Sequence, residues 1–118
     1  MIVLAEKKDL APIVQYQETD SFACRILCIA NMYGNYPFAD FWIQKQKETG
    51  HPTAYLSKMD GVITLFAHEN ADFGELCMFI KMMGASCMIC HASCAEQLHI
   101  IPARTGIIMK WKGRLTEQ

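Results

Sequence analysis

The dipeptide Asp60-Gly61 lies between two segments rich in β-forming residues, and it predicts a tight β-hairpin. A two-residue type I′ turn needs positive φ at both central residues, which Asp and Gly tolerate better than most residues do. The segments TAYLSKM and VITLFA are therefore expected to pair as antiparallel strands. Because the apolar residues of the second segment, 62–67, run nearly unbroken, this strand is expected to be covered on both faces in the middle of a sheet.

The segment after this hairpin predicts a helix whose start and end are both marked. Asp72 is a suitable N-cap residue, and Glu75, three residues later, would complete a capping box. Gly84 is the residue expected where the helix stops in a left-handed conformation. The apolar residues recur at helical spacing: Phe73, Leu76, Cys77, Phe79, Ile80 and Met83. Residues 87–90 beyond the helix are expected to form a second buried strand.

The rest of the chain predicts a regular alternation of helices and strands, without a linker or an internal repeat. A first helix is expected to start near Asp9, with Leu10, Ile13 and Val14 on one face. A second helix opens at Asp20 or Ser21 and ends at Gly34-Asn35, since Asp and Ser favour helix starts and Gly favours helix ends. The remaining predictions are a strand at 2–5, a strand at 39–45, a short helix at 94–98, a turn at 102–106 and a last strand at 107–112.

Length and composition point to one domain, residues 1–118, with an apolar excess. Hydrophobic residues make up 52% of the chain and charged residues only 19%, and we interpret the excess as surface intended for another chain or domain. A formal net charge of −1 and a pI near 6.4 give no basic footprint for nucleic acid. Neither a signal peptide nor an apolar run of membrane-spanning length is found. We therefore expect a cytoplasmic protein whose six cysteines are thiols.

The cysteines near the end of the chain suggest metal or haem chemistry, but their spacing favours a structural role. Cys87-x-x-Cys90-His91 matches the attachment pattern of c-type haem, which belongs to exported chains. A zinc site would draw on Cys87, Cys90, His91, Cys94 and His99. Because residues three apart in a strand point to opposite faces, Cys87 and Cys90 would not chelate one ion without a turn between them. We expect no metal and interpret these cysteines as small buried side chains.

Two further cysteine patterns leave chemical alternatives open. Cys24 and Cys28 lie one helical turn apart, but no histidine pair on the same helix completes a metal site. Cys94 would be a nucleophile if it lay at a helix N-terminus, where the helix dipole lowers the pKa of a thiol, with His91 or His99 as its base. A structural role for Cys94 is the simpler interpretation.

The segment His68-Glu69-Asn70 is the most polar turn next to the predicted core. It follows the central strand directly and precedes the capped helix. Because ends of buried strands are favoured positions for ligands, His68 and Glu69 are the candidate catalytic residues. The alternative is a plain loop that carries a helix cap.

In its order of elements, the chain resembles the GNAT family of N-acetyltransferases. The opening IVLAEKKDLAPIVQY is similar to the start of that family. There a strand precedes a helix whose cap has the pattern acidic residue-Asp-Leu. The segments SFACRI, FADFWIQ and GHPTAYLSKMDGVITLFAHENADFGELCMFI resemble the reduced amino-terminal module of clostridial-type GNAT proteins. The resemblance implies an α+β fold with a mixed, mostly antiparallel sheet of about six strands, flanked by three to four helices. It also implies that the C-terminal hairpin of the family is truncated here.

One departure from the family pattern bears on function. GNAT enzymes hold the acetyl-CoA pyrophosphate in a Gln/Arg-x-x-Gly-x-Gly/Ala loop at the start of the long helix. The corresponding residues 68–75 contain one glycine, no Arg or Lys, and three carboxylates: Glu69, Asp72 and Glu75. A capping Asp72 would occupy amides that a phosphate needs, so no cofactor is expected. The tyrosine that often acts as general acid in that family has no counterpart after Tyr55.

Three hypotheses follow for the function. The first is a degenerate GNAT-like module without its own acetyl-CoA site, which packs against a second copy of itself, as a homodimer, or against a catalytic domain. The second is an active acyl-CoA-dependent N-acetyltransferase with an atypical site near His68 and Glu69, for which acetyl-CoA is the cofactor. The third is a thiol redox or metal-binding protein. Neither nucleic acid nor a membrane is an expected partner.

Overall fold

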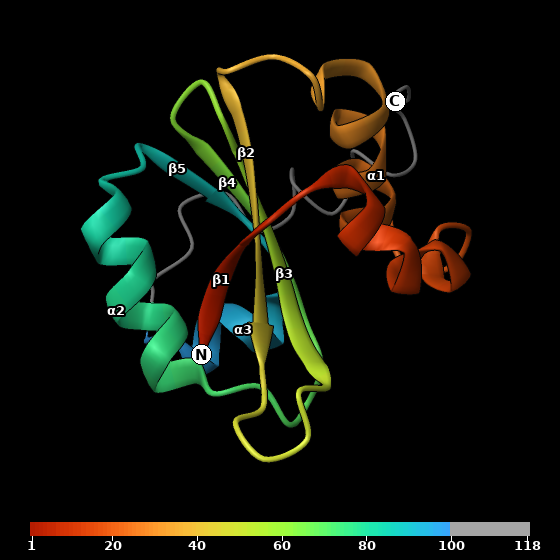
Figure 1. Ribbon diagram of the computed structural model, residues 1–118. Helices are drawn as coiled ribbons and strands as arrows, with labels where there is room; N and C mark the ends of the chain where they lie inside the picture. The colour runs from red at the N-terminus through yellow and green to blue at the C-terminus, as the bar shows by residue number, and fades with distance from the viewer. Residues whose placement is uncertain (100–118) are drawn as a thin grey trace.

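The computed structural model describes residues 1–99 and shows an α+β fold (Figure 1). The predicted turn at 102–106 and the predicted strand at 107–112 lie outside the described residues. In chain order the elements are β1 (Ile2–Ala5), the 3₁₀ helix η1 (Lys7–Tyr16), α1 (Ser21–Tyr33), β2 (Ala39–Lys45), β3 (Pro52–Met59), β4 (Val62–Ala67), α2 (Phe73–Met83), β5 (Cys87–Ile89) and α3 (Ala92–Gln97).

The strands form one five-stranded mixed sheet in the order β1-β2-β3-β4-β5. The first four strands are antiparallel to their neighbours, and β5 is parallel to β4. The predicted hairpin is confirmed, because Met59 pairs with Val62 and the turn residues Asp60 and Gly61 have φ values of 55° and 77°. The predicted central position of β4 is confirmed as well, since it lies between β3 and β5.

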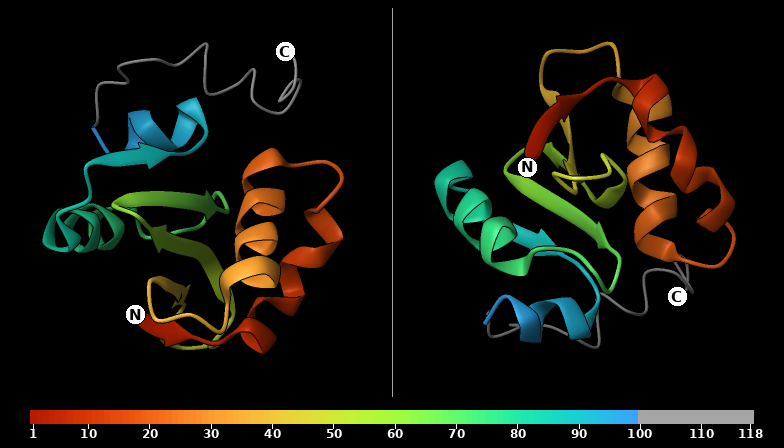
Figure 2. Two further views of the ribbon diagram at one scale, coloured as in Figure 1. Left: turned by 90° about the horizontal axis from the view of Figure 1, so that it is seen from above. Right: turned by 60° about the horizontal axis from the view of Figure 1, so that its bottom comes forward.

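Helices cover both faces of the sheet. Figure 2 shows η1 and α1 on one side and α2 on the other, with the strands between them. Because side chains of a strand alternate between faces, Phe41, Ile43 and Tyr55 pack toward η1 and α1. Leu56 and Leu65 pack in a second apolar cluster with Leu76 of α2 and with Cys94 and Leu98 at α3. The sheet therefore separates two apolar cores.

The helix predicted from Asp9 is a 3₁₀ helix that begins earlier. Glu6 is its N-cap, and Asp9 completes a capping box with it. The prediction that Val14 shares the buried face is wrong, because Val14 is 53% exposed. A 3₁₀ helix has three residues per turn, so Leu10 and Ile13 align with half-buried Tyr16 and leave Val14 on the outside.

Helix α1 follows the sequence prediction closely. The Asp20 carboxylate accepts the N–H groups of Phe22 and Ala23 at 2.8 and 3.0 Å, and Gly34 is the C-cap residue. Its buried residues line one side of the helix: Phe22, Ala23, Ile26, Leu27, Ile29 and Ala30. None of the helices within residues 1–99 combines the length and the hydrophobicity needed to cross a membrane.

The strand predicted at 87–90 is shorter and less buried than expected. β5 contains three residues; Cys87 is exposed, while Met88 and Ile89 are half-buried. Within the described part of the chain β5 pairs only with β4, so one of its edges has no strand beside it. The prediction of a second buried strand is therefore wrong for Cys87.

Candidate functional site

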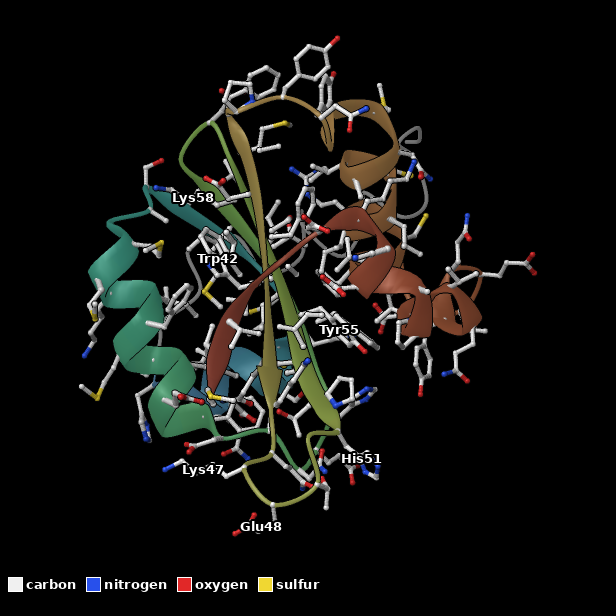
Figure 3. All side chains as sticks on the ribbon, viewed as in Figure 1. Trp42, Lys47, Glu48, His51, Tyr55 and Lys58 are labelled. Carbon is white, nitrogen blue, oxygen red and sulfur yellow. The ribbon has the colours of Figure 1, made fainter. Side chains whose placement is uncertain are left out.

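His68 lies directly after β4, and three aromatic rings surround it. Its backbone N–H donates to the Thr53 carbonyl at 2.8 Å, which extends the ladder between β3 and β4 by one bond. The centre of its ring is 5.6 Å from that of Tyr16, 6.4 Å from that of Tyr55 and 5.3 Å from that of Phe66. Figure 3 shows Tyr55 on the side of the sheet that faces η1. The end of β4 thus carries a compact group of one imidazole and three other rings.

Tyr55 brings the second titratable group of this cluster. Tyr55 is 1% exposed. Burial, and to a smaller extent the nearby Tyr16, raises the pKa of its phenol to about 12. At neutral pH the phenol is therefore protonated, and it is available as a hydrogen-bond donor rather than as a base.

Glu69 does not join this group. It is exposed, and within residues 1–99 its carboxylate makes no hydrogen bond and no ion pair. The two candidate catalytic residues are therefore adjacent in sequence but are not organised as a pair. Neighbouring residues in a turn have no fixed periodicity, so sequence spacing did not decide how their side chains would lie.

Side chains bind several groups at the N-terminus of α2, although the predicted capping box is not formed. The Asp72 carboxylate accepts the Glu75 N–H at 3.0 Å, as predicted. The reciprocal bond is replaced, because the Asp72 N–H donates to Gln44 Oε1 at 3.0 Å. Glu75 Oε1 instead accepts Gln44 Nε2 at 2.8 Å and the N-terminal ammonium of Met1 at 3.0 Å. The capping-box prediction is thus wrong for Glu75.

Gln44 of β2 is the residue that connects these groups. It is 1% exposed, and its Oε1 also accepts the Thr53 hydroxyl at 2.7 Å, while its Nε2 donates to the Asp72 carbonyl at 2.9 Å. Sequence analysis missed Gln44 because a single polar residue near the end of a strand is commonly solvent-exposed. The only sequence signal for its burial was the alternation of side chains along β2, which puts Gln44 on the same face of the sheet as Trp42.

Two backbone amides at this helix start have no partner in the part of the chain that the structure describes. The N–H groups of Phe73 and Gly74 donate to no acceptor among residues 1–99. The carboxylates of Asp72 and Glu75 lie in the same turn, and no Lys or Arg side chain of the described chain forms an ion pair with either. Free amides favour an anion there, whereas two carboxylates oppose one.

A second polar contact joins distant parts of the chain just after the end of β5, which runs parallel to β4. The distance between His91 Nε2 and Asp20 Oδ2 is 2.6 Å. The His91 ring also lies edge-on to Phe22, with ring centres 4.4 Å apart. Since Asp20 caps α1 with its other oxygen, one carboxylate ties α1 to the segment between β5 and α3.

The thiols beside this contact are poorly suited to nucleophilic chemistry. Cys94 is 4% exposed. Burial, and to a smaller extent the negative charge of Asp20, raises the pKa of its thiol. Burial likewise raises the pKa of Cys90 to about 12, with Cys94 as the smaller cause. Because the thiolate is the nucleophile, these raised pKa values do not favour the hypothesis that Cys94 attacks a substrate.

The structure brings no metal centre together in its described part. No group of three or more His, Cys, Asp or Glu side chains within residues 1–99 is arranged to hold an ion. The predicted proximity of Cys24 and Cys28 is found, with their sulfur atoms 3.9 Å apart on α1. Burial, followed by the charge of Cys28, raises the pKa of the Cys24 thiol.

Two surface cavities lie away from the candidate residues. One, of about 400 Å³, is lined by residues 4–8 of β1 and η1 and by residues flanking the start of β2. The other, of about 510 Å³, lies between η1 and α1 and is mostly apolar, with Leu10, Val14 and Leu27 among its lining residues. Neither includes His68, Glu69 or the start of α2.

Comparison with known proteins gives no relative for this chain: no family model, no curated protein and no solved structure matches it.

Proposed function

We propose that this chain is a GNAT-like module that has no acetyl-CoA pyrophosphate site at α2 and that acts by packing against another protein. The observation that carries the proposal is the acidic start of α2, where Gln44, Asp72 and Glu75 use one another's hydrogen-bonding groups.

The order of elements supports the GNAT-like part of this proposal. Four antiparallel strands are followed by a long helix and by a strand parallel to β4, which is the order on which the resemblance rests. A pyrophosphate in such a fold would lie between the end of β4 and the start of α2. Whether this chain binds acetyl-CoA in the way that GNAT enzymes do therefore depends on the side chains and amides at that point.

Electrostatics at that point oppose a pyrophosphate. Each carboxylate within about 4 Å of a phosphate oxygen would cost about 1 kcal/mol in water and more in a partly buried site. Asp72 supplies one such charge, and Glu75 supplies a second that the Met1 ammonium, 3.0 Å from its Oε1, partly offsets. The amides of Phe73 and Gly74, which have no acceptor among residues 1–99, are a small compensation for these costs.

The packing role rests on the uneven burial of α2. Among its eleven residues only Leu76 is fully buried, although the helix is apolar over most of its length. Met78 and Met82 are exposed over 68% and 77% of their surface. Exposed methionines on a helix are typical of surfaces that bind other proteins.

One observation favours the alternative of an active N-acetyltransferase. The His68 ring lies among Tyr16, Tyr55 and Phe66, so an imidazole and two phenols are close enough to share proton-transfer work on a substrate. In that case a base near His68 would act on an amine, and acetyl-CoA would bind by contacts other than the α2 amides.

Calorimetric titration of the full chain with acetyl-CoA separates the two functions. We expect no saturable binding at ligand concentrations up to about 1 mM, the range of weak association. Micromolar binding would overturn the proposal, and its loss in His68→Ala would then locate the site beside the ring cluster.

A charge-removing variant tests the stated physical reason. The double substitution Asp72→Asn and Glu75→Gln retains the N-cap and removes two negative charges. If carboxylates are the obstacle, this variant should bind free pyrophosphate more tightly than the wild type does. Equal affinity for pyrophosphate in both proteins would show that the carboxylates are not what excludes it. The matched control is Glu18→Gln with Glu48→Gln, because it also removes two charges, at exposed positions outside residues 68–75.

A further inference from the structure

Two thiols lie one turn apart on the surface of α1. The sulfur atoms of Cys24 and Cys28 are 3.9 Å apart, with Cys28 exposed and Cys24 half-buried. No other two thiols within residues 1–99 come within hydrogen-bonding distance of each other. Figure 2 shows α1 on the face of the sheet opposite α2, so this pair is separate from the residues at the start of α2. The proposed packing role does not use it.

Helix α1 holds the two thiols in a fixed relation. Asp20 caps the start of the helix and Gly34 ends it. Between these caps, Arg25 Nε donates to the hydroxyl of Thr64 in β4 at 2.9 Å, and the buried residues of the helix pack on the sheet. Ligands on a rigid helix are preorganised, so an ion that binds them does not have to order the backbone.

The spacing of the pair suits a shared metal ion better than a disulfide. Residues four apart on a helix have Cβ atoms about 5–6 Å apart. A disulfide needs its Cβ atoms closer together, at about 3.5–4.5 Å. In contrast, two sulfur atoms 3.9 Å apart can both lie at about 2.3 Å from one ion, with an angle of about 116° at the ion. The pair can therefore hold an ion without distortion of α1.

The donor set selects the kind of metal. Thiolates are soft ligands that favour Cu(I), and Cu(I) needs fewer ligands than the four that Zn²⁺ takes in structural sites. Asp20 lies one turn before Cys24, but one of its carboxylate oxygens accepts two helix N–H groups and the other lies 2.6 Å from His91 Nε2. Since no group of three or more His, Cys, Asp or Glu side chains within residues 1–99 is arranged around an ion, the pair fits Cu(I) better than Zn²⁺.

We propose that Cys24 and Cys28 together bind one Cu(I) ion on the surface of α1. Each thiol releases its proton to solvent as its sulfur binds copper, so two thiolates hold the ion and its oxidation state does not change. Without an ion, burial and then the charge of Cys28 raise the pKa of the Cys24 thiol. A bound cation reverses this charge effect because it attracts both thiolates. The exposure of Cys28 leaves the ion accessible to exchange with thiols in solution.

Anaerobic competition with the Cu(I) chelator bicinchoninate, with ascorbate as reductant, tests the site. We expect the wild type to remove one Cu(I) per chain from the chelator. Cys24→Ser with Cys28→Ser should lower the affinity about a hundredfold or more, because loss of the ligands should cost at least as much as loss of a residue that supports a ligand. Cys87→Ser with Cys90→Ser also removes two thiols and should bind copper like the wild type. Equal affinity in the two double variants, or a wild type that removes no copper, would overturn the proposal.

Moving the pair along α1 tests the spacing. Cys24→Ser with Met32→Cys leaves thiols at positions 28 and 32, again four residues apart, and Met32 is 64% exposed. This variant should recover most of the affinity that Cys24→Ser loses. Cys24→Ser with Met78→Cys adds its thiol at a similarly exposed position on α2 and should not recover it. Recovery in both variants, or in neither, would contradict a site made by one helix. Circular dichroism confirms that each variant is folded.

Titration with Zn²⁺ tests the choice of metal. We expect weak binding of Zn²⁺ that changes little in Cys24→Ser with Cys28→Ser, because two protein ligands leave the rest of the zinc coordination shell to water. A large loss of Zn²⁺ affinity in this variant, with its Cu(I) affinity unchanged, would assign the pair to zinc and reject the copper site.

Discussion

The side chain of Gln44 binds both backbone groups of Asp72, with Oε1 accepting its N–H at 3.0 Å and Nε2 donating to its carbonyl at 2.9 Å. Twenty-eight residues separate the two in sequence. This pair of bonds attaches the turn between β4 and α2 to β2. The start of α2 is therefore fixed by a neighbouring strand as well as by its own N-cap residue.

Replacing Gln44 with Ala should destabilise the protein strongly. The substitution leaves the Thr53 hydroxyl and the Asp72 backbone without their partners, and unsatisfied buried groups cost about 1–3 kcal/mol each. We expect a loss of about 2–4 kcal/mol in the free energy of unfolding, measured by chemical denaturation. Gln15→Ala removes the same side chain at an exposed position and should cost about 0.5 kcal/mol or less. Similar losses in both variants would contradict the role assigned to Gln44.

The contact between Asp20 and His91 should appear as coupling in a double-mutant cycle. Asp20→Asn keeps the N-cap of α1 but removes the charge, and His91→Phe keeps a ring against Phe22 but removes the nitrogen. Because the His91 side chain is 44% exposed, the expected coupling is small, about 0.5–1 kcal/mol. Additive effects of the two substitutions on the free energy of unfolding would show that the 2.6 Å contact adds no stability.

Tyr55 should make the protein lose stability at alkaline pH. Its pKa is about 12 in the folded chain, against about 10 for an unfolded chain. Between these values the unfolded state releases the phenol proton and the folded state keeps it, so stability is fully present below about pH 10 and declines as the pH rises toward 12. Denaturant unfolding at a series of pH values should show this decline in the wild type. Tyr55→Phe should flatten it, and an unchanged slope would contradict the assignment.

The cysteines should differ in their rates of alkylation. Cys28 and Cys87 are exposed, whereas Cys94 is buried and burial raises the thiol pKa of both Cys90 and Cys94. Iodoacetamide at pH 8 followed by peptide mass spectrometry should therefore label Cys28 and Cys87 first. Rapid labelling of Cys94 in the folded protein would indicate an accessible thiolate and revive the nucleophile hypothesis.

Features encoded within a few neighbouring residues could be predicted from the sequence. The hairpin at Asp60-Gly61 and the caps at Asp20 and Asp72 each depend on local backbone geometry and on a side chain that reaches only its own turn. The α+β order followed from these elements and from the apolar patterns between them. The burial of Val14 was predicted wrongly because residues four apart share a face in an α-helix but not in a 3₁₀ helix, where residues three apart align.

Only the tertiary structure decided which polar groups meet. Nothing near Glu75 in sequence indicated that its carboxylate would bind Gln44 and Met1 instead of closing a capping box. Nothing near His91 indicated Asp20, which lies 71 residues earlier. The physical reason is that a buried polar group needs a partner, and the packing of strands and helices selects that partner from segments far apart in the chain.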